Sequence, residues 1–255
     1  MSSIRQPLAT PLLEVEGVSK DFGGVRAVSH LSFTLGSGDL LGIMGPNGSG
    51  KTTLFNLLAG ALSPDGGHIR LRGQDIAGLA PHRICALGIA RTFQLVRTFG
   101  GLSALENVLV GRLYGRTRSS AAEAAADAER LLALVGIEGR SHLPARQLTL
   151  IDRKRLELAR ALATSPDILL LDEFLAGLNP AETATAMVLI RGLLNAGMTI
   201  LMVEHIVWAL MDLASRIIVI SAGEKIAEGP PEAIAADPAV LEAYLGTERG
   251  SWARA

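Results

Sequence analysis

A glycine-rich stretch contains the residues best suited to chemistry. Residues 45–53 read GPNGSGKTT and fit the phosphate-loop pattern G-x-x-x-x-G-K-[ST] at every position. Glycines allow close backbone approach, so that successive N–H groups point at phosphate oxygens. Lys51 would bridge the β- and γ-phosphates, and the Thr52 hydroxyl would ligate Mg²⁺. The pattern predicts a nucleoside triphosphate held by Gly45, Pro46, Asn47, Gly48, Ser49, Gly50, Lys51, Thr52 and Thr53.

Two carboxylates follow an apolar run further along the chain. Residues 168–171 are all apolar and predict a buried strand that ends at Asp172 and Glu173. We expect Asp172 to hold Mg²⁺ through its water shell. Glu173, on the other side of the pleat, is expected to orient or deprotonate the attacking water. Acidic pairs after strands are common, and the phosphate loop in the same chain favours this Walker B interpretation.

Three further side chains are candidates for the same site. Residues 199–203 predict a second buried strand, and a strand order that sets it beside the first would aim His205 at the γ-phosphate. A single histidine after a strand is more often structural. Gln94 ends a short strand predicted at 88–94. Phe22 lies in a glycine-flanked turn, where it would either stack on the adenine ring or cap the edge of a sheet.

The composition indicates a globular protein and excludes several other classes. The chain has 255 residues, of which 49% are hydrophobic and 19% are charged. A single cysteine, Cys85, excludes an internal disulfide framework, and the five histidines lack zinc-site spacing. A net charge of −1 without long basic runs argues against nucleic acid as a partner. No secretory signal or apolar run of about 20 residues is present, so we expect a cytosolic chain unless another protein holds it at a membrane.

The elements that must position these residues alternate between strands and helices. Strands are predicted at 12–18 and 31–35, before the strand at 39–44 and the helix at 52–61 that flank the phosphate loop. An edge hairpin is expected at 68–76. A helical part is expected from about residue 100 to 162, with an N-cap at Ser119-Ser120, a capping box at Glu123 and a stop at Gly136. Its second helix, 153–162, is expected to carry Arg153, Lys154, Glu157 and Arg160 on its outer face.

The last third of the chain predicts one long helix, a hairpin and two short helices. Asn179, Pro180 and Glu182 have the residue types of an N-cap, N1 and N3. We expect the apolar side of that helix to include Met187, Val188, Ile190 and Leu194. A hairpin is predicted at 217–228, two short helices within 230–245, and a polar tail from residue 246.

Taken in order, these motifs resemble the nucleotide-binding subunit of ABC transporters over nearly the whole chain. Six stretches look most like the ATP-binding subunits of branched-chain amino-acid uptake systems, including relatives that carry urea or small amides. They are DFGGVRAV, GPNGSGKTTLFNLLAG, GIARTFQ, LENVLVGR, DEFLAGLNPAE and IAEGPPEAIAADPAVLEAYLG. The resemblance implies an α/β P-loop NTPase (ABC ATPase) core with an antiparallel β subdomain and an inserted α-helical subdomain. It divides the chain into core at 1–94, helical subdomain at 95–162, core at 163–229 and a C-terminal extension at 230–255.

The resemblance also implies roles and partners. Glu173, His205 as the switch histidine and Gln94 would be catalytic, with ATP and Mg²⁺ bound and Gln94 touching the metal. Asn179 would lie in a loop that crosses to a second ATP-binding subunit, either a different chain or a second copy. Two transmembrane permease subunits, and indirectly a periplasmic or extracellular substrate-binding protein, would complete the assembly at the cytoplasmic face of the cell membrane. The transported substrate is not encoded in such a cassette.

One segment departs from the family pattern. The signature L-S-G-G-Q should fall at residues 148–152, which read LTLID, so that Leu150 and Ile151 replace both glycines. Asp152 is expected to bring a negative charge towards the phosphate of the opposite site, which would then be slow. The alternative is full activity through Thr149 and the helix N-terminus. Phe174 also stands where the family usually has proline, and the sequence offers no physical account of it.

The sequence therefore predicts an ATPase subunit that powers uptake of small molecules. A second hypothesis is a soluble ABC ATPase in DNA repair or translation. Such proteins generally carry two cassettes, a coiled coil or a basic arm, and none of these occurs here. A third is a P-loop kinase for a small metabolite, against which Glu173 and His205 favour water as the nucleophile.

Overall fold

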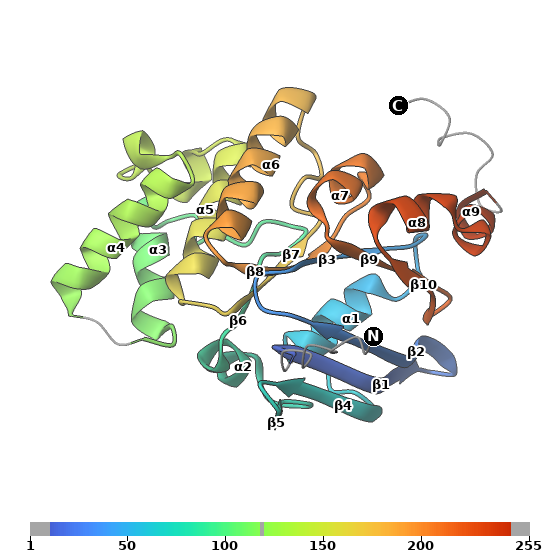
Figure 1. Cartoon of the computed structure of the whole chain (residues 1–255). Coiled ribbons are helices and arrows are strands. Elements are labelled where there is room, and N and C mark those ends of the chain that lie inside the picture. Colours follow the sequence, from blue (N-terminus) through green and yellow to red (C-terminus); the bar gives the residue numbers. More distant parts are fainter. Residues whose placement is uncertain (1–10, 118–119, 246–255) are drawn as a thin grey trace, which may run out of the picture.

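The computed structural model describes residues 11–117 and 120–245, which form two sheets and the helices around them (Figure 1). The strands in chain order are β1 (Leu13–Phe22), β2 (Val25–Leu35), β3 (Leu40–Met44), β4 (Gly66–Leu71), β5 (Gln74–Asp75), β6 (Ile89–Arg91), β7 (Ile168–Asp172), β8 (Thr199–Val203), β9 (Arg216–Ser221) and β10 (Glu224–Gly229). The α-helices are α1 (Lys51–Leu58), α2 (Pro81–Leu87), α3 (Ala104–Tyr114), α4 (Ala121–Leu134), α5 (Leu150–Ala163), α6 (Pro180–Asn195), α7 (Val207–Leu213), α8 (Pro231–Ala236) and α9 (Pro238–Leu245).

The larger sheet forms the centre of the molecule. Its six strands have the order β10-β9-β3-β8-β7-β6 and run parallel except for β10. Strands β3, β7 and β8 are buried along their whole length, as expected for a parallel sheet covered on both faces. Figure 1 shows α5, α6 and α7 on one face and α1 on the other, between this sheet and the four-stranded antiparallel sheet β2-β1-β4-β5. The predicted fold class is confirmed.

Alternate residues of each central strand pack into different cores. Leu169 and Leu171 face the cluster with α5, α6 and α7, whereas Ile168 and Leu170 face the cluster with α1 and the antiparallel sheet. This follows from the two-residue period of a strand. A continuous apolar run is therefore what a strand with a core on either side requires.

The strand register brings the candidate loops to one edge. Asp172 pairs in register with Val203, and Val203 with Ile43. The carboxyl ends of β3, β7 and β8 therefore lie side by side, and the chain leaves them through the phosphate loop and the loops after Asp172 and Val203. The prediction that the strand ending at Asp172 lies beside the strand that precedes His205 is confirmed.

The helices α3, α4 and α5 pack together at one end of the molecule (Figure 1). The Ser120–Glu123 capping box at the start of α4 is confirmed, and Gly136 follows the helix with a φ of 76°. Ser119 lies outside the described residues. A second capping box, Ser103 with Glu106, begins α3, which was not predicted as a separate helix; nor was α2. The division into subdomains at residues 94, 162 and 229 stays a prediction.

Two predicted helix faces are partly wrong. Helix α5 begins at Leu150, three residues earlier than expected, and Lys154 and Glu157 are not on its outer face but are only 3% and 2% exposed. Their charged ends reach main-chain groups of neighbouring loops, which a polarity pattern does not reveal. In α6, Met187 and Ile190 are buried, but Val188 is 71% exposed because it lies about 100° round the helix from Met187.

The C-terminal elements follow the prediction. Strands β9 and β10 form a hairpin through Ala222 and Gly223, both at positive φ, and α8 and α9 follow. The predicted polar tail from residue 246 lies outside the described residues. Within the described part of the chain, none of the helices has the length and apolar character required to span a bilayer.

Candidate active site

The phosphate loop connects β3 to α1 and is shaped around its glycines. Gly45 and Gly50 have φ values of 155° and 106°. A Cβ at Gly45 would approach the carbonyl oxygen of Ile220 to 2.0 Å, and one at Gly50 that of Ala27 to 2.2 Å. Both positions therefore require glycine. Helix α1 starts directly after Gly50, so its free N–H groups face the loop.

The Lys51 side chain is folded back over this loop. Its Nζ donates hydrogen bonds to the carbonyl oxygens of Gly45 at 2.8 Å and Pro46 at 2.9 Å, and the residue is only 6% exposed. Burial lowers the pKa of Lys51, while Glu173 and Asp172 oppose that shift. The loop thus holds a cation where a phosphate is expected.

A cavity of about 290 Å³ opens beside the loop. It is lined by Ala27, Asn47, Gly48, Ser49, Gly50, Lys51, Thr52, Thr53, Gln94, Glu173 and His205. The cavity therefore combines most of the predicted phosphate-loop residues with the three side chains predicted to be catalytic.

Glu173 is held from two sides at the mouth of that cavity. Gln94 Nε2 donates to Glu173 Oε2 at 2.6 Å, and His205 Nε2 lies 2.7 Å from Glu173 Oε1. The three residues come from the loops after β6, β7 and β8. Glu173 itself has a φ of 50°, an uncommon conformation for a residue other than glycine, and its N–H donates to the Val203 carbonyl at 2.9 Å. The carboxylate is consequently fixed in one orientation.

Asp172 is buried behind Glu173 and has a cationic partner. Arg91 Nη2 donates to Asp172 Oδ2 at 2.6 Å, and Arg91 Nη1 donates to Asn56 Oδ1 at 2.6 Å. The side chains of Arg91 and Asp172 are 8% and 3% exposed. Arg91 therefore connects the end of β7 to α1. Sequence reasoning missed this residue, whose signal was an arginine at the end of the short strand before Gln94.

The structure does not bring Phe22 to the cavity. Phe22 ends β1, is 45% exposed and is absent from the residues that line the cavity. The Lys20 ammonium lies 5.6 Å from the centre of the ring. Its stacking role stays a prediction.

The segment that departs from the family signature forms the start of α5. Thr149 is the N-cap, and its hydroxyl both accepts from Asp152 N at 3.3 Å and donates to Asp152 Oδ2 at 2.6 Å. Asp152 is 1% exposed and forms ion pairs with Arg140 and Arg155. The expectation that Asp152 brings its charge towards the phosphate of the opposite site is therefore wrong, because the buried carboxylate accepts from the Thr149 hydroxyl and pairs with the two arginines. Only Leu150 and Ile151 remain as departures at the surface.

Phe174 acquires a structural explanation. Its side chain is 3% exposed and packs in the core cluster with α5 and α6. The Lys154 ammonium lies 5.9 Å from the centre of its ring. The phenyl group therefore fills the core and contacts a buried cation.

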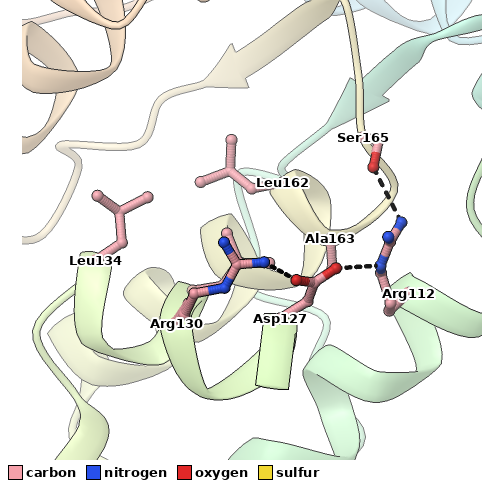
Figure 2. A pocket seen from close by; sticks show the side chains of 8 residues that line it. Arg112, Asp127, Arg130, Leu134, Leu162, Ala163 and Ser165 are labelled. Carbon is pink, nitrogen blue, oxygen red and sulfur yellow. Dashed lines mark hydrogen bonds and ion pairs between the residues drawn. The ribbon is translucent and has the colours of Figure 1, made fainter. Parts of the chain in front are cut away.

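A second cavity, of about 370 Å³, lies between α3, α4 and the end of α5 (Figure 2). Figure 2 shows Asp127 pointing toward both Arg112 and Arg130, and Arg112 Nε lies 2.8 Å from the Asp127 carboxylate. Leu134 and Leu162 form an apolar part of the wall of this cavity. The acidic group is already paired with both arginines, so the cavity beside the phosphate loop is the candidate active site.

Family profiles and relatives of known sequence match this chain. The profile described as "ABC transporter" matches residues 28–176, and that described as "Branched-chain amino acid ATP-binding cassette transporter" matches residues 224–249. The high-affinity branched-chain amino acid transport ATP-binding protein LivG of Salmonella typhimurium is 40% identical in an alignment of 253 residues, which covers 94% of this chain and 99% of LivG. The corresponding protein BraF of Pseudomonas aeruginosa has the same identity and coverage.

Solved structures agree in fold. An ATP-binding cassette of an ABC transporter in its ADP conformation superposes with a TM-score of 0.85 at 29% identity, covering 93% of this chain and all of that one. A dimeric cassette in a post-hydrolysis state, bound to ADP and Pi, gives a TM-score of 0.77 at 26% identity and covers 86% of this chain and 98% of that one. With a profile over more than half of its length and near full-length relatives at 40% identity, this chain belongs to the ATP-binding subunits of ABC transporters, in their branched-chain amino acid group.

Proposed function

We propose that this subunit hydrolyses ATP to energise the import of branched-chain amino acids, or of related small amino acids and amides, through separate membrane subunits. The observation that carries the proposal is the carboxylate of Glu173, held by Gln94 and His205 at the mouth of the phosphate-loop cavity. The names of LivG and BraF support the substrate class.

The phosphate loop would bind the triphosphate. Lys51, which now donates to two loop carbonyls, would turn its ammonium to the β- and γ-phosphates, and the N-terminus of α1 would add N–H donors. The oxygen atoms of Thr52, Gln94 and, through water, Asp172 are of the hard type that Mg²⁺ prefers. The bound ion would neutralise charge on the phosphates.

Glu173 would act as the general base. Gln94 and His205 each occupy one of its oxygens, so an attacking water would meet a carboxylate whose orientation is already fixed. Burial of Glu173, which is 7% exposed, keeps bulk water from competing for it. His205 itself lies at the surface of the site, where its second ring nitrogen would respond to the state of the nucleotide.

The loop after Gln94 is the proposed contact for the membrane subunits. Leu95 is 80% exposed and Phe99 is 49% exposed, an unusual exposure for large apolar side chains beside a catalytic residue. Arg97 lies between them. Substitutions at Arg97 or Phe99 should reduce transport more than ATP binding. A second ATP-binding subunit would meet this chain at the start of α5 and at the loop that contains Asn179, and the two ATP-binding subunits would lie peripherally at the cytoplasmic face of the cell membrane.

The two alternatives draw less support. The relatives above are named as transport proteins, which does not favour a soluble ABC ATPase in repair or translation. A metabolite kinase would need a second substrate hydroxyl beside the γ-phosphate, whereas the Glu173–His205 pair is suited to activating water.

Transport in reconstituted vesicles tests the proposal. The subunit would be purified with its permease subunits, placed in liposomes with the substrate-binding protein, and supplied with labelled leucine and Mg-ATP. We expect uptake that requires ATP and disappears with Glu173→Gln. ATP hydrolysis without uptake of any branched-chain amino acid or small amide would contradict the substrate class, and purification with ribosomes or DNA in place of permeases would support the soluble alternative.

A further inference from the structure

Helix α5 buries two opposite charges one turn apart. Lys154 is 3% exposed and Glu157 is 2% exposed. Burial lowers the pKa of Lys154 and raises that of Glu157, so each charge carries a desolvation cost that its contacts must offset. Such groups are retained inside a protein when specific partners hold them.

Each of these charges contacts the main chain of a different catalytic loop. Lys154 Nζ donates to the carbonyl oxygens of Glu173 at 3.2 Å and Phe174 at 2.8 Å. The Glu157 carboxylate accepts from the N–H groups of Phe93 at 3.2 Å and Arg97 at 2.8 Å. The first loop carries Glu173, and the second carries Gln94. Helix α5 therefore holds both of the loops that the Gln94–Glu173 hydrogen bond joins.

The backbone conformation of Glu173 explains why its loop needs such contacts. A φ of 50° is strained at a residue other than glycine and persists where the surroundings impose it. The N–H of Glu173 is fixed by Val203 on β8, and its side chain by Gln94 and His205. The carbonyl end is fixed by Lys154.

Glu204 completes the same support from the third loop. Its Oε1 accepts from the N–H of Leu175 at 2.8 Å, and Lys154 opposes the rise in its pKa that burial causes. The residue directly before His205 thus holds the main chain two residues after Glu173. Lys154 is the central charge of this arrangement, since both carboxylates that hold loops, Glu157 and Glu204, interact with it.

We propose that Lys154 and Glu157 are positioning residues of the ATPase site. They fix the positions of Glu173 and Gln94 relative to each other without touching the nucleotide. The proposal rests on the proposed role of Glu173 as the base. Because Thr149, the N-cap of α5, lies in the segment that would face the opposite nucleotide, a displacement of this helix would reach the two catalytic loops together.

The test separates turnover from nucleotide binding. In the assembled complex, Lys154→Met should lower kcat by about 10- to 100-fold, since a shift of about 1 Å in a catalytic group costs up to that factor. The KM for ATP, and the affinity of the subunit for a fluorescent nucleotide, should stay within about twofold, because the phosphate loop is untouched. Glu157→Gln should act in the same direction, and Lys154→Arg should restore part of kcat by keeping a donor.

A neighbouring cation provides the matched control. Arg155 lies next in the same helix but pairs with Asp152, so Arg155→Met should keep a larger kcat than Lys154→Met. If Lys154→Met does not fold, Lys154→Gln retains one donor and serves in its place. A kcat within threefold of wild type in the folded variant, or an equal loss of kcat and affinity, would overturn the inference.

A double variant distinguishes positioning from loss of stability. Lys154 is proposed to act through Glu173, so adding Lys154→Met to Glu173→Gln should cause no further loss of the residual ATPase rate. Additive losses would contradict the inference. An inactive wild-type complex would instead contradict the proposed function, whereas an active wild type with an equally active Lys154→Met variant would contradict only the positioning role.

Discussion

His205 Nε2 lies 2.7 Å from Glu173 Oε1, a contact that joins the ends of two neighbouring parallel strands. Because β7 and β8 run in register, this contact needs no long side chain and no distortion of the sheet. The first prediction concerns the carboxylate that this contact orients.

Glu173→Gln should abolish turnover while leaving nucleotide binding intact. The amide keeps the size of the side chain but removes the base, whose contribution is typically about 10²–10⁴ in rate. ATP hydrolysis by the assembled complex and titration with a fluorescent nucleotide measure the two properties. Lys51→Ala provides the contrast, since it should weaken binding itself. A hydrolysis rate within about threefold of wild type for Glu173→Gln would rule out Glu173 as the base.

Arg91→Met should destabilise the fold. The substitution leaves the Asp172 carboxylate, 3% exposed, without its buried cation, and loss of one partner of a buried ion pair costs about 3–5 kcal/mol. Thermal unfolding should show a Tm lower by roughly 10 °C. Arg26→Met is the matched control, because the Arg26–Asp21 pair is exposed and should contribute little to stability. Equal Tm values for both variants would show that Arg91 is not needed to stabilise Asp172.

Glu204→Gln should remove part of the pH dependence of stability. Burial raises the pKa of Glu204 from 4.5 to about 7, against opposing contributions from Leu175 N–H and Lys154, while Glu173 adds to the rise. The folded state therefore favours the protonated form. The associated stability is complete below about pH 4.5 and is lost as the pH rises through about 7, a difference of roughly 3 kcal/mol.

Denaturant titrations of the two proteins at pH 5 and pH 8 measure this effect. Glutamine keeps an acceptor for Leu175 N–H and does not titrate, so the stability of the variant relative to wild type should be greater at pH 8 than at pH 5. An identical difference at both pH values would show that Glu204 does not titrate in this range.

The two ATP sites of a complex with a different partner subunit should be unequal. The site built from Lys51, Asp172, Glu173 and His205 would be closed by the partner, whereas the opposite site would be closed by Leu150 and Ile151, which lack the close backbone approach of glycine. Glu173→Gln should then remove most ATPase activity, and the equivalent change in the partner little. Equal losses would show that these side chains do not disable the site they face, and the burial of Asp152 already removes one reason for expecting that they do.

The sequence identified the site mainly because its residues lie at strand ends. Apolar runs before Asp172 and His205 predict buried strands, and parallel strands in register must bring those ends together. The phosphate loop was predicted in full because its pattern depends on residues close together in the chain. The role of Gln94 came from the family resemblance, because Gln94 lies in a loop and hydrophobic periodicity does not predict the position of a loop residue.

Contacts between a side chain and a distant main chain were not predictable. Lys154 and Glu157 have the spacing of a solvated helix face, and the sequence does not show that loops at 93–97 and 173–174 cover them. For the same reason the sequence did not reveal the role of Arg91, whose hydrogen-bond partners lie on α1 and β7. The environment of Asp152 was not predicted because the expected start of α5 was three residues too late, which placed Asp152 before the helix and not in its first turn.

The contact between α9 and the phosphate loop has a consequence for the order of synthesis. Tyr244 is partly buried, and this burial raises its pKa to about 12 against an opposing hydrogen bond from the Gly45 main chain. The ribosome releases the phosphate loop early and Tyr244 near the end of the chain. A nascent subunit therefore has its phosphate loop long before the loop acquires this contact, which comes only with the region matched by the branched-chain profile, residues 224–249.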